Sequence, residues 1–187
     1  MNTQSPEYVI ALTTAWLEQI VIGLNLCPFA KSVHSKGQIR YVVSKATTSE
    51  KLEEELKTEL ETLNVASSEI IETVLLIHPY VLINFLDYND FLSIADGLVS
   101  QCGLEGILQI ASFHPDYQFS NTSSTDIENN TNRSPFPMLH LLREESIERA
   151  VRSIPDAADI FEVNITTLQK LGIEKLEQIQ KNLLRNI

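Results

Sequence analysis

The sequence lacks the features that mark several broad classes of protein. It has only two cysteines, seven prolines and six glycines in 187 residues, and no apolar run approaches the roughly 18 residues of a membrane span. Cys27 and Cys102 have no metal-type pair spacing, which argues against a disulfide framework. No basic-then-apolar leader precedes the first predicted helix. We therefore expect a cytoplasmic protein that makes no membrane contact.

Positive charge is also scarce. Lys and Arg total 14 against 25 Asp and Glu, a formal net charge of -11. This balance argues against a nucleic-acid-binding protein, which needs a concentrated basic surface, but it allows a small local anion pocket. The 43% of hydrophobic residues can bury a substantial core. We expect one domain over residues 1–187, with residues 154–187 as a helical C-terminal extension.

Hydrophobic spacing predicts the main helices. Apolar residues recur at intervals of three and four in Glu7–Leu26, Lys51–Leu63 and Asn84–Cys102. Ser134-Pro135-Phe136-Pro137 has the composition of a helix start, and it predicts a helix that continues to about residue 153. Two weaker helices are expected after residue 154.

Short β-branched or apolar runs between these helices predict the strands Gln38–Val43, Ile70–Ile77 and Gly106–Phe113. The sequence thus predicts an α/β fold with a small sheet of about three strands covered by helices. A ferredoxin-like arrangement with mixed pairing is the competing topology, and the strand order stays open.

The most informative segment is the long aperiodic stretch that follows the third predicted strand. Loops of this length are commonly binding loops or lids. His114 and Asp116 lie just beyond the strand, where α/β sheets bind ligands. Asp116 could orient the imidazole for general-base catalysis, or both could bind one metal ion. A structural turn is the alternative.

The predicted helix after this loop would place His140, Arg143 and Glu144 on one face near its N-terminus. Together with Arg133, this arrangement predicts a corner that holds an anionic substrate between two guanidinium groups. A surface salt bridge of Arg143 is the alternative.

Cys27 stands at a turn fixed by Pro28, where the first helix is expected to end. It could form a nucleophilic pair with His114 or His140, or join them and Asp116 around a divalent transition metal. A small cysteine that only packs is the alternative. The catalytic and metal hypotheses both require Cys27, His114 and His140 to converge in one pocket.

Four strings resemble a bacterial family catalogued as domain of unknown function 1415: GLNLCPFA from Gly23, FLDYNDFL from Phe85, GLEGILQIASFHPDYQF from Gly103 and TNRSPFPMLHLLREESI from Thr131. The resemblance extends from about Val9 to Leu171 and implies no particular reaction. The chain departs from the family pattern at Ser120-Asn121, where Ala-Gly is usual, and at Phe136, where Tyr is common.

Three functional hypotheses follow. The first is a small enzyme that acts on an anionic substrate, with His114, Asp116 and Cys27 catalytic, Arg133, Arg143 and Asn132 binding substrate, and His114, Asp116 and His140 as metal ligands. The second is a non-catalytic module that binds a small molecule or a metal. The third is a structural corner in which Arg133, Asp116 and Asn132 only fix the loop.

Overall fold

The computed structural model describes residues 5–152 and 160–185. In this part of the chain, four strands form one mixed sheet in the order β1-β2-β4-β3. The strands are β1 (Ile39–Val43), β2 (Thr73–Ile77), β3 (Leu108–Phe113) and β4 (Met138–Arg143). β1 is parallel to β2, and β4 is antiparallel to both β2 and β3. Consequently β1, β2 and β3 run in one direction, and their carboxyl ends lie at one edge of the sheet.

The predicted α/β fold is confirmed, and the three predicted strands correspond to β1, β2 and β3. The helix predicted from residue 134 is wrong in its first half, because residues 138–143 form the strand β4 and α5 (Glu144–Arg152) begins only after it. Residue 153, where that helix was predicted to end, and the predicted boundary at residue 154 lie outside the described residues.

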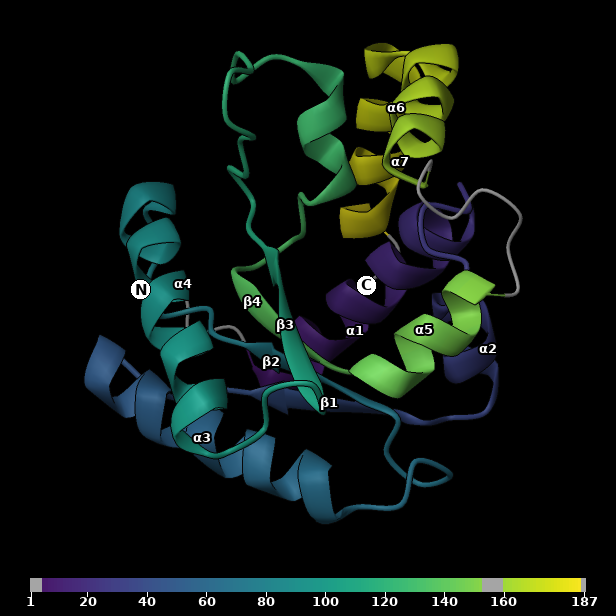
Figure 1. The fold of residues 1–187 in the computed structure, drawn as a ribbon. Coiled ribbons are helices and arrows are strands. Elements are labelled where there is room, and N and C mark those ends of the chain that lie inside the picture. Colours follow the sequence, from purple (N-terminus) through teal and green to yellow (C-terminus); the bar gives the residue numbers. More distant parts are fainter. Residues whose placement is uncertain (1–4, 153–159, 186–187) are drawn as a thin grey trace.

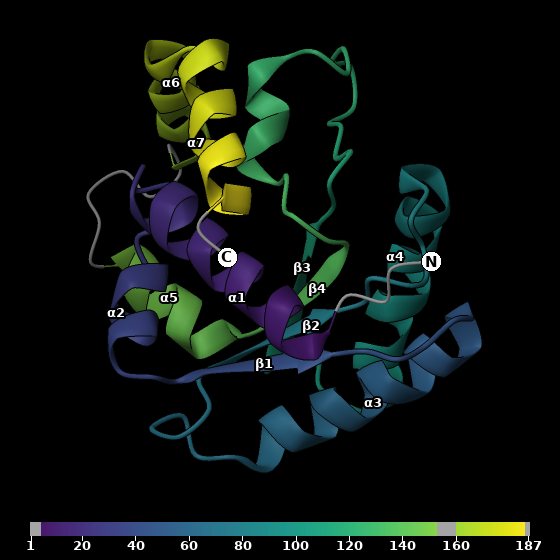
Figure 2. The ribbon, with the colours of Figure 1, turned by 180° about the vertical axis from the view of Figure 1, so that it is seen from behind.

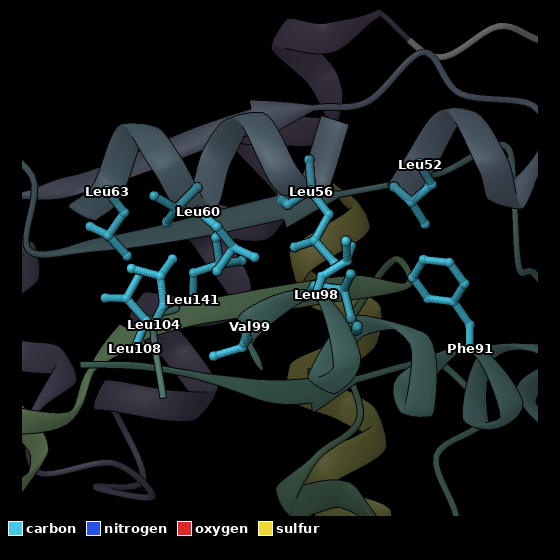
Figure 3. Packing of buried hydrophobic residues seen from close by; sticks show 14 of the residues in the cluster. Leu52, Leu56, Leu60, Leu63, Phe91, Leu98, Val99, Leu104, Leu108 and Leu141 are labelled. Atoms are coloured by element: carbon cyan, nitrogen blue, oxygen red, sulfur yellow. The ribbon is translucent and has the colours of Figure 1, made fainter. Parts of the chain in front are cut away.

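The helices α3 (Ser49–Val65) and α4 (Phe85–Gln101) cover one face of the sheet (Figure 1). The side chains of Thr48 and Asn84 cap their first turns by accepting backbone hydrogen bonds. Four leucines of α3 point toward α4 and the sheet, as Figure 3 shows for Leu52, Leu56, Leu60 and Leu63. Both helices confirm the predictions from hydrophobic spacing.

The other face is covered by the N- and C-terminal helices (Figure 2). These are α1 (Pro6–Trp16), which continues as the π-helix η1 (Leu17–Ile22), α2 (Ala30–Ser35), α6 (Ile160–Leu171) and α7 (Ile173–Arg185). Leu168 of α6 and Leu176 of α7 are fully buried in the same apolar cluster as Trp16. The two C-terminal helices therefore contribute to the core on this face.

The long loop between β3 and β4 projects away from the sheet and runs beside α6 and α7 (Figures 1 and 2). It contains the short 3₁₀ helix η2 (Ile127–Thr131), which packs against α6. No helix in the described ranges is long and apolar enough to cross a membrane.

Candidate functional site

Three buried polar residues mark the edge of the sheet where β1, β2 and β3 end. Ser44, His78 and His114 each follow directly after one of these strands and are at most 2% exposed. Ligands of α/β proteins usually bind outside the carboxyl ends of strands. The site predicted around His114 therefore lies at an edge that suits ligand binding.

Both ring nitrogens of His114 have backbone partners. Nδ1 accepts a hydrogen bond from the Asp116 amide at 3.0 Å, so Nε2 carries the proton and donates to the Leu82 carbonyl at 3.3 Å. Burial lowers the pKa of His114, while the Leu82 carbonyl and the Asp116 carboxylate raise it by less. A general base at this position would first have to release one of its partners. The catalytic roles of His114 and Asp116 stay predictions.

A second buried histidine, His78, belongs to the same edge, although the sequence analysis gave it no function. The sequence does contain a signal, because His-Pro follows both β2 and β3. The Tyr88 ring contacts both imidazoles, with centroids 5.7 Å from His78 and 5.1 Å from His114. His78 Nδ1 donates to the Val81 carbonyl at 3.0 Å, which leaves Nε2 a buried acceptor without a partner among the described residues. Burial lowers the pKa of His78 to about 4, so the ring is neutral at neutral pH.

Side-chain hydrogen bonds hold the long loop in place. Asn129 is fully buried, and its Oδ1 accepts from the Phe119 amide and the Thr122 hydroxyl, both at 2.9 Å. Asn132 donates from its amide nitrogen to the Ser112 carbonyl at 3.0 Å, which anchors the loop to β3. The substrate contact predicted for Asn132 stays a prediction, and its observed contact is structural.

Arg133 lines a pocket of about 350 Å³ between α1, α7 and this loop. Its Nε donates to the Tyr117 carbonyl at 3.1 Å, and Nη2 donates to the Ser124 carbonyl at 2.7 Å. Among the described lining residues Arg133 is the only charged one, and it forms no ion pair with another described residue. Burial lowers the pKa of Arg133, and nearby Asp116 raises it by less, but a guanidinium remains charged at neutral pH.

Cys27 and His140 line a second cavity of about 60 Å³, on the α1 side of the sheet. The Thr73 hydroxyl donates to the Leu141 carbonyl at 2.5 Å, so its oxygen accepts from His140 Nε2 at 2.8 Å. Burial lowers the pKa of His140 to about 4 and raises the pKa of the Cys27 thiol. Both groups are uncharged at neutral pH, whereas a nucleophilic cysteine works as its thiolate. The catalytic role of Cys27 stays a prediction.

The expected convergence of Cys27, His114 and His140 is not found. His140 contacts Phe113 on the α1 side of the sheet, whereas His114 packs against Phe85 of α4 on the other side. Within the residues that the structure describes, no three His, Cys, Asp or Glu side chains are grouped closely enough to hold a metal ion. The predicted set of His114, Asp116 and His140 is not assembled, because the sheet separates the two histidines.

The anion corner predicted at Arg143 rested on helical spacing from His140, and that spacing is wrong in a strand, where residues three apart face opposite sides. Arg143 Nη2 instead donates, at 2.7, 2.8 and 3.0 Å, to the carbonyls of Leu63, Ala66 and Ile71. Arg133 precedes the opposite end of β4, whose six residues span about 17 Å at about 3.4 Å per residue. The two guanidinium groups therefore cannot hold one small anion.

The family model described as Protein of unknown function (DUF1415) matches residues 8–178. The chain therefore belongs to this family, and the resemblance of its sequence motifs is confirmed. Searches of curated proteins and of solved structures found no match. The family description assigns no reaction, so any function has to be inferred from the site.

Proposed function

We propose that this protein binds a small anionic molecule in the pocket at Arg133. One electrostatic observation carries the proposal: in a chain of net charge -11, the charge on the described pocket wall is a guanidinium without an ion pair. A partly buried cation attracts an anion more strongly than an exposed one does, because the effective dielectric constant is lower there. Exposed Asp116 acts on this guanidinium only through space, so an anion in the pocket would supply the direct ion pair that the described residues do not.

The pocket also limits the shape of this ligand. A guanidinium has five N–H donors, and two of those of Arg133 are used by carbonyls, so the others can bind carboxylate or phosphate oxygens. Asn130 and Gln180 add neutral polar groups, while Leu12, Trp16 and Leu183 form apolar walls. The volume of about 350 Å³ lies in the lower part of the usual range of roughly 300–1,000 Å³. We infer an organic anion with an apolar body.

The described lining of the pocket favours a protein that binds the anion without converting it. Its described lining residues include no imidazole, thiol or carboxyl group, and the Ser134 hydroxyl donates to the Phe136 carbonyl at 2.7 Å. An enzyme is the second candidate, and one observation favours it: His114 and Asp116 flank Pro115, which lines the pocket. Chemistry there would require His114 to leave its backbone partners when the ligand binds.

A thermal-shift panel of phosphates, sulfate, monocarboxylates and dicarboxylates tests the proposal. We expect at least one anion to raise the melting temperature of the wild type. Arg133→Gln should lower the affinity for that anion by at least about tenfold, or about 1.4 kcal/mol. Arg149→Gln, which changes an exposed arginine of α5, is the matched control and should bind as the wild type does. If no anion stabilises the wild type, the proposal fails.

A second pair of variants separates anion binding from the loop contacts of Arg133. Leu184 lines the pocket and is 60% exposed, so its replacement should cost little stability. Leu184→Glu places a negative charge at the pocket rim and should weaken anion binding, whereas the neutral isostere Leu184→Gln should not. Equal affinities of these two variants would contradict an anion in this pocket.

A further inference from the structure

A polar groove lies between α2 and α5, at the edge of the sheet opposite to Arg133. Both views of the fold show these helices side by side (Figures 1 and 2). The groove has a volume of about 480 Å³. Its described walls include Ser32 and Lys36 from α2 and its C-terminal end, Glu69 and Glu72 before β2, and Ser146 and Arg149 from α5.

Glu72 lines this groove with a largely buried side chain whose carboxylate oxygens remain accessible. The residue is only 7% exposed, and its carboxylate forms no hydrogen bond or ion pair with another described residue. A carboxylate at the wall of a groove is only partly hydrated, so a cation or hydrogen-bond donors in the groove would stabilise it. The free carboxylate therefore favours a cationic ligand.

The other charged side chains of the groove affect a ligand less. Lys36, Glu69 and Arg149 are exposed, and exposed charges are screened by solvent and salt. Arg149 also donates to the Ser146 hydroxyl at 2.8 Å. These three residues carry two positive charges and one negative charge, so the preference for a cation depends on the low exposure of Glu72.

The groove adjoins the small cavity that contains Cys27 and His140. Phe29 and Val33 line both spaces, and Glu72 in the groove is followed in the chain by Thr73 in the cavity. The cavity of about 60 Å³ has room for about two water-sized groups, since one water occupies about 30 Å³. Its walls are mostly apolar, and Thr73 and His140 hydrogen-bond each other. A short alkyl group therefore fits this cavity better than a charged group does.

We infer that the groove and the cavity together bind a small organic cation, a primary ammonium with a short alkyl tail. The ammonium donates to the Glu72 carboxylate, and the tail passes Phe29 and Val33 into the cavity. An anionic ligand is disfavoured because its charge would lie beside Glu72. This site differs from the Arg133 pocket in position and in the sign of its charge, so either proposal can fail without the other.

Calorimetric titration with propylamine, 1-propanol and propionate tests the charge preference. We expect propylamine to bind with a Kd of roughly 0.1–10 mM, as suits a ligand of four heavy atoms, and the other two to bind at least about tenfold more weakly. Glu72→Gln should remove this preference. Glu69→Gln, the matched control in the same groove, should keep it.

Several results would overturn the inference. They are the absence of propylamine binding to the wild type, equal binding of 1-propanol, and equal losses in the two glutamate variants. The comparison of the three ligands uses the wild type alone, so it decides the matter even if Glu72→Gln does not fold.

Alkylation by iodoacetamide, followed by peptide mass spectrometry, locates the tail. Cys27 lines the cavity, whereas Cys102 lies at the end of α4 on the other side of the sheet and is the internal reference. Saturating propylamine should slow the alkylation of Cys27 at least about threefold relative to that of Cys102. An unchanged ratio of the two rates would contradict a tail in the cavity.

Discussion

The Tyr88 hydroxyl connects α4 to the two strands that flank the candidate site. It donates to the Met138 carbonyl and accepts from the Phe113 amide, both at 2.9 Å, and these two residues are paired between β4 and β3. Burial raises the pKa of Tyr88, so the phenol keeps its proton and remains a donor. This hydroxyl holds α4 against the start of β4 and against the end of β3, which His114 follows directly.

Tyr88→Phe should lower the free energy of unfolding by about 1–3 kcal/mol, because the Phe113 amide loses its acceptor inside the fold. Urea denaturation followed by circular dichroism measures the change, and the slope of the transition should stay constant. Wild-type stability in the variant would show that water or a shifted backbone replaces the hydroxyl.

Asp116 influences the proposed anion site through its charge. The residue is exposed, its carboxylate raises the pKa of Arg133, and only its backbone amide binds His114. Asp116→Asn should therefore strengthen binding of the stabilising anion by about 1.4- to fivefold, as removal of an exposed charge pair of about 0.2–1 kcal/mol implies. Calorimetric titration of both proteins measures the ratio. A weaker anion affinity in Asp116→Asn would mean that Asp116 supports the site.

At the level of whole elements, β4 joins the parallel pair of β1 and β2 to β3. It lies between β2 and β3, and the side chain at its end, Arg143, binds the carbonyls of Leu63 and Ala66 at the C-terminal end of α3. The last carbonyls of a helix have no partners within the helix, and a positive charge also compensates the helix dipole there. Arg143 thus connects α3 to the central strand.

Arg143→Met should destabilise the protein by about 2–3 kcal/mol, since hydrogen bonds from a charged group contribute more than neutral ones. Arg143→Lys should lose less stability than Arg143→Met, because lysine keeps the charge and one donor group. Arg149→Met, at an exposed position of α5, should remain within about 0.5 kcal/mol of the wild type. Equal stabilities of Arg143→Met and Arg149→Met in urea would contradict the connecting role of Arg143.

The same elements show how far the sequence determines the fold. The helices α3 and α4 could be predicted to within two residues at each end, because apolar residues recur at helical spacing in both. The strand β4 was missed because a strand buried on both faces has a continuous apolar run without alternation. Pro137 was the contrary signal, since it disfavours a helical conformation of the residue before it.

The position of the candidate site could be predicted in part. Arg133 and Asp116 both belong to the long loop that the sequence indicated, and the structure brings them close enough for the charge of Asp116 to raise the pKa of Arg133. The separation of His140 from His114 depends on which face of the sheet each side chain occupies. When residues 138–143 are taken as a helix instead of a strand, the face that His140 occupies is predicted wrongly. The contact between His78 and Tyr88 joins two elements, and only the tertiary packing reveals it.

Across the whole molecule, neutral histidines on both faces of the sheet make stability depend on pH. Burial lowers the pKa of His78 and of His140 from the ordinary value of 6.5 to about 4. Above pH 6.5 both rings are neutral in the folded and in the unfolded chain. Between pH 6.5 and 4 only the unfolded chain takes up these protons, so stability falls as the pH falls.

The expected loss is about 3 kcal/mol for each histidine on going from about pH 7 to pH 4, at 1.36 kcal/mol per pKa unit. Urea denaturation across this range measures it. His78→Asn, which cannot titrate, should show a smaller loss than the wild type, even if it is less stable at pH 7. Parallel pH profiles of the two proteins would show that His78 protonates equally easily in the folded state.

The central claim is that a small anion binds at Arg133, and NMR of the arginine Nε–H groups tests it most directly. The resonance of Arg133 is titrated with the anion that stabilises the protein most, and Arg149 provides the reference. We predict that the Arg133 signal shifts and saturates with the Kd found by calorimetry, while the Arg149 signal stays in place. Saturable binding with an unchanged Arg133 resonance would contradict the account.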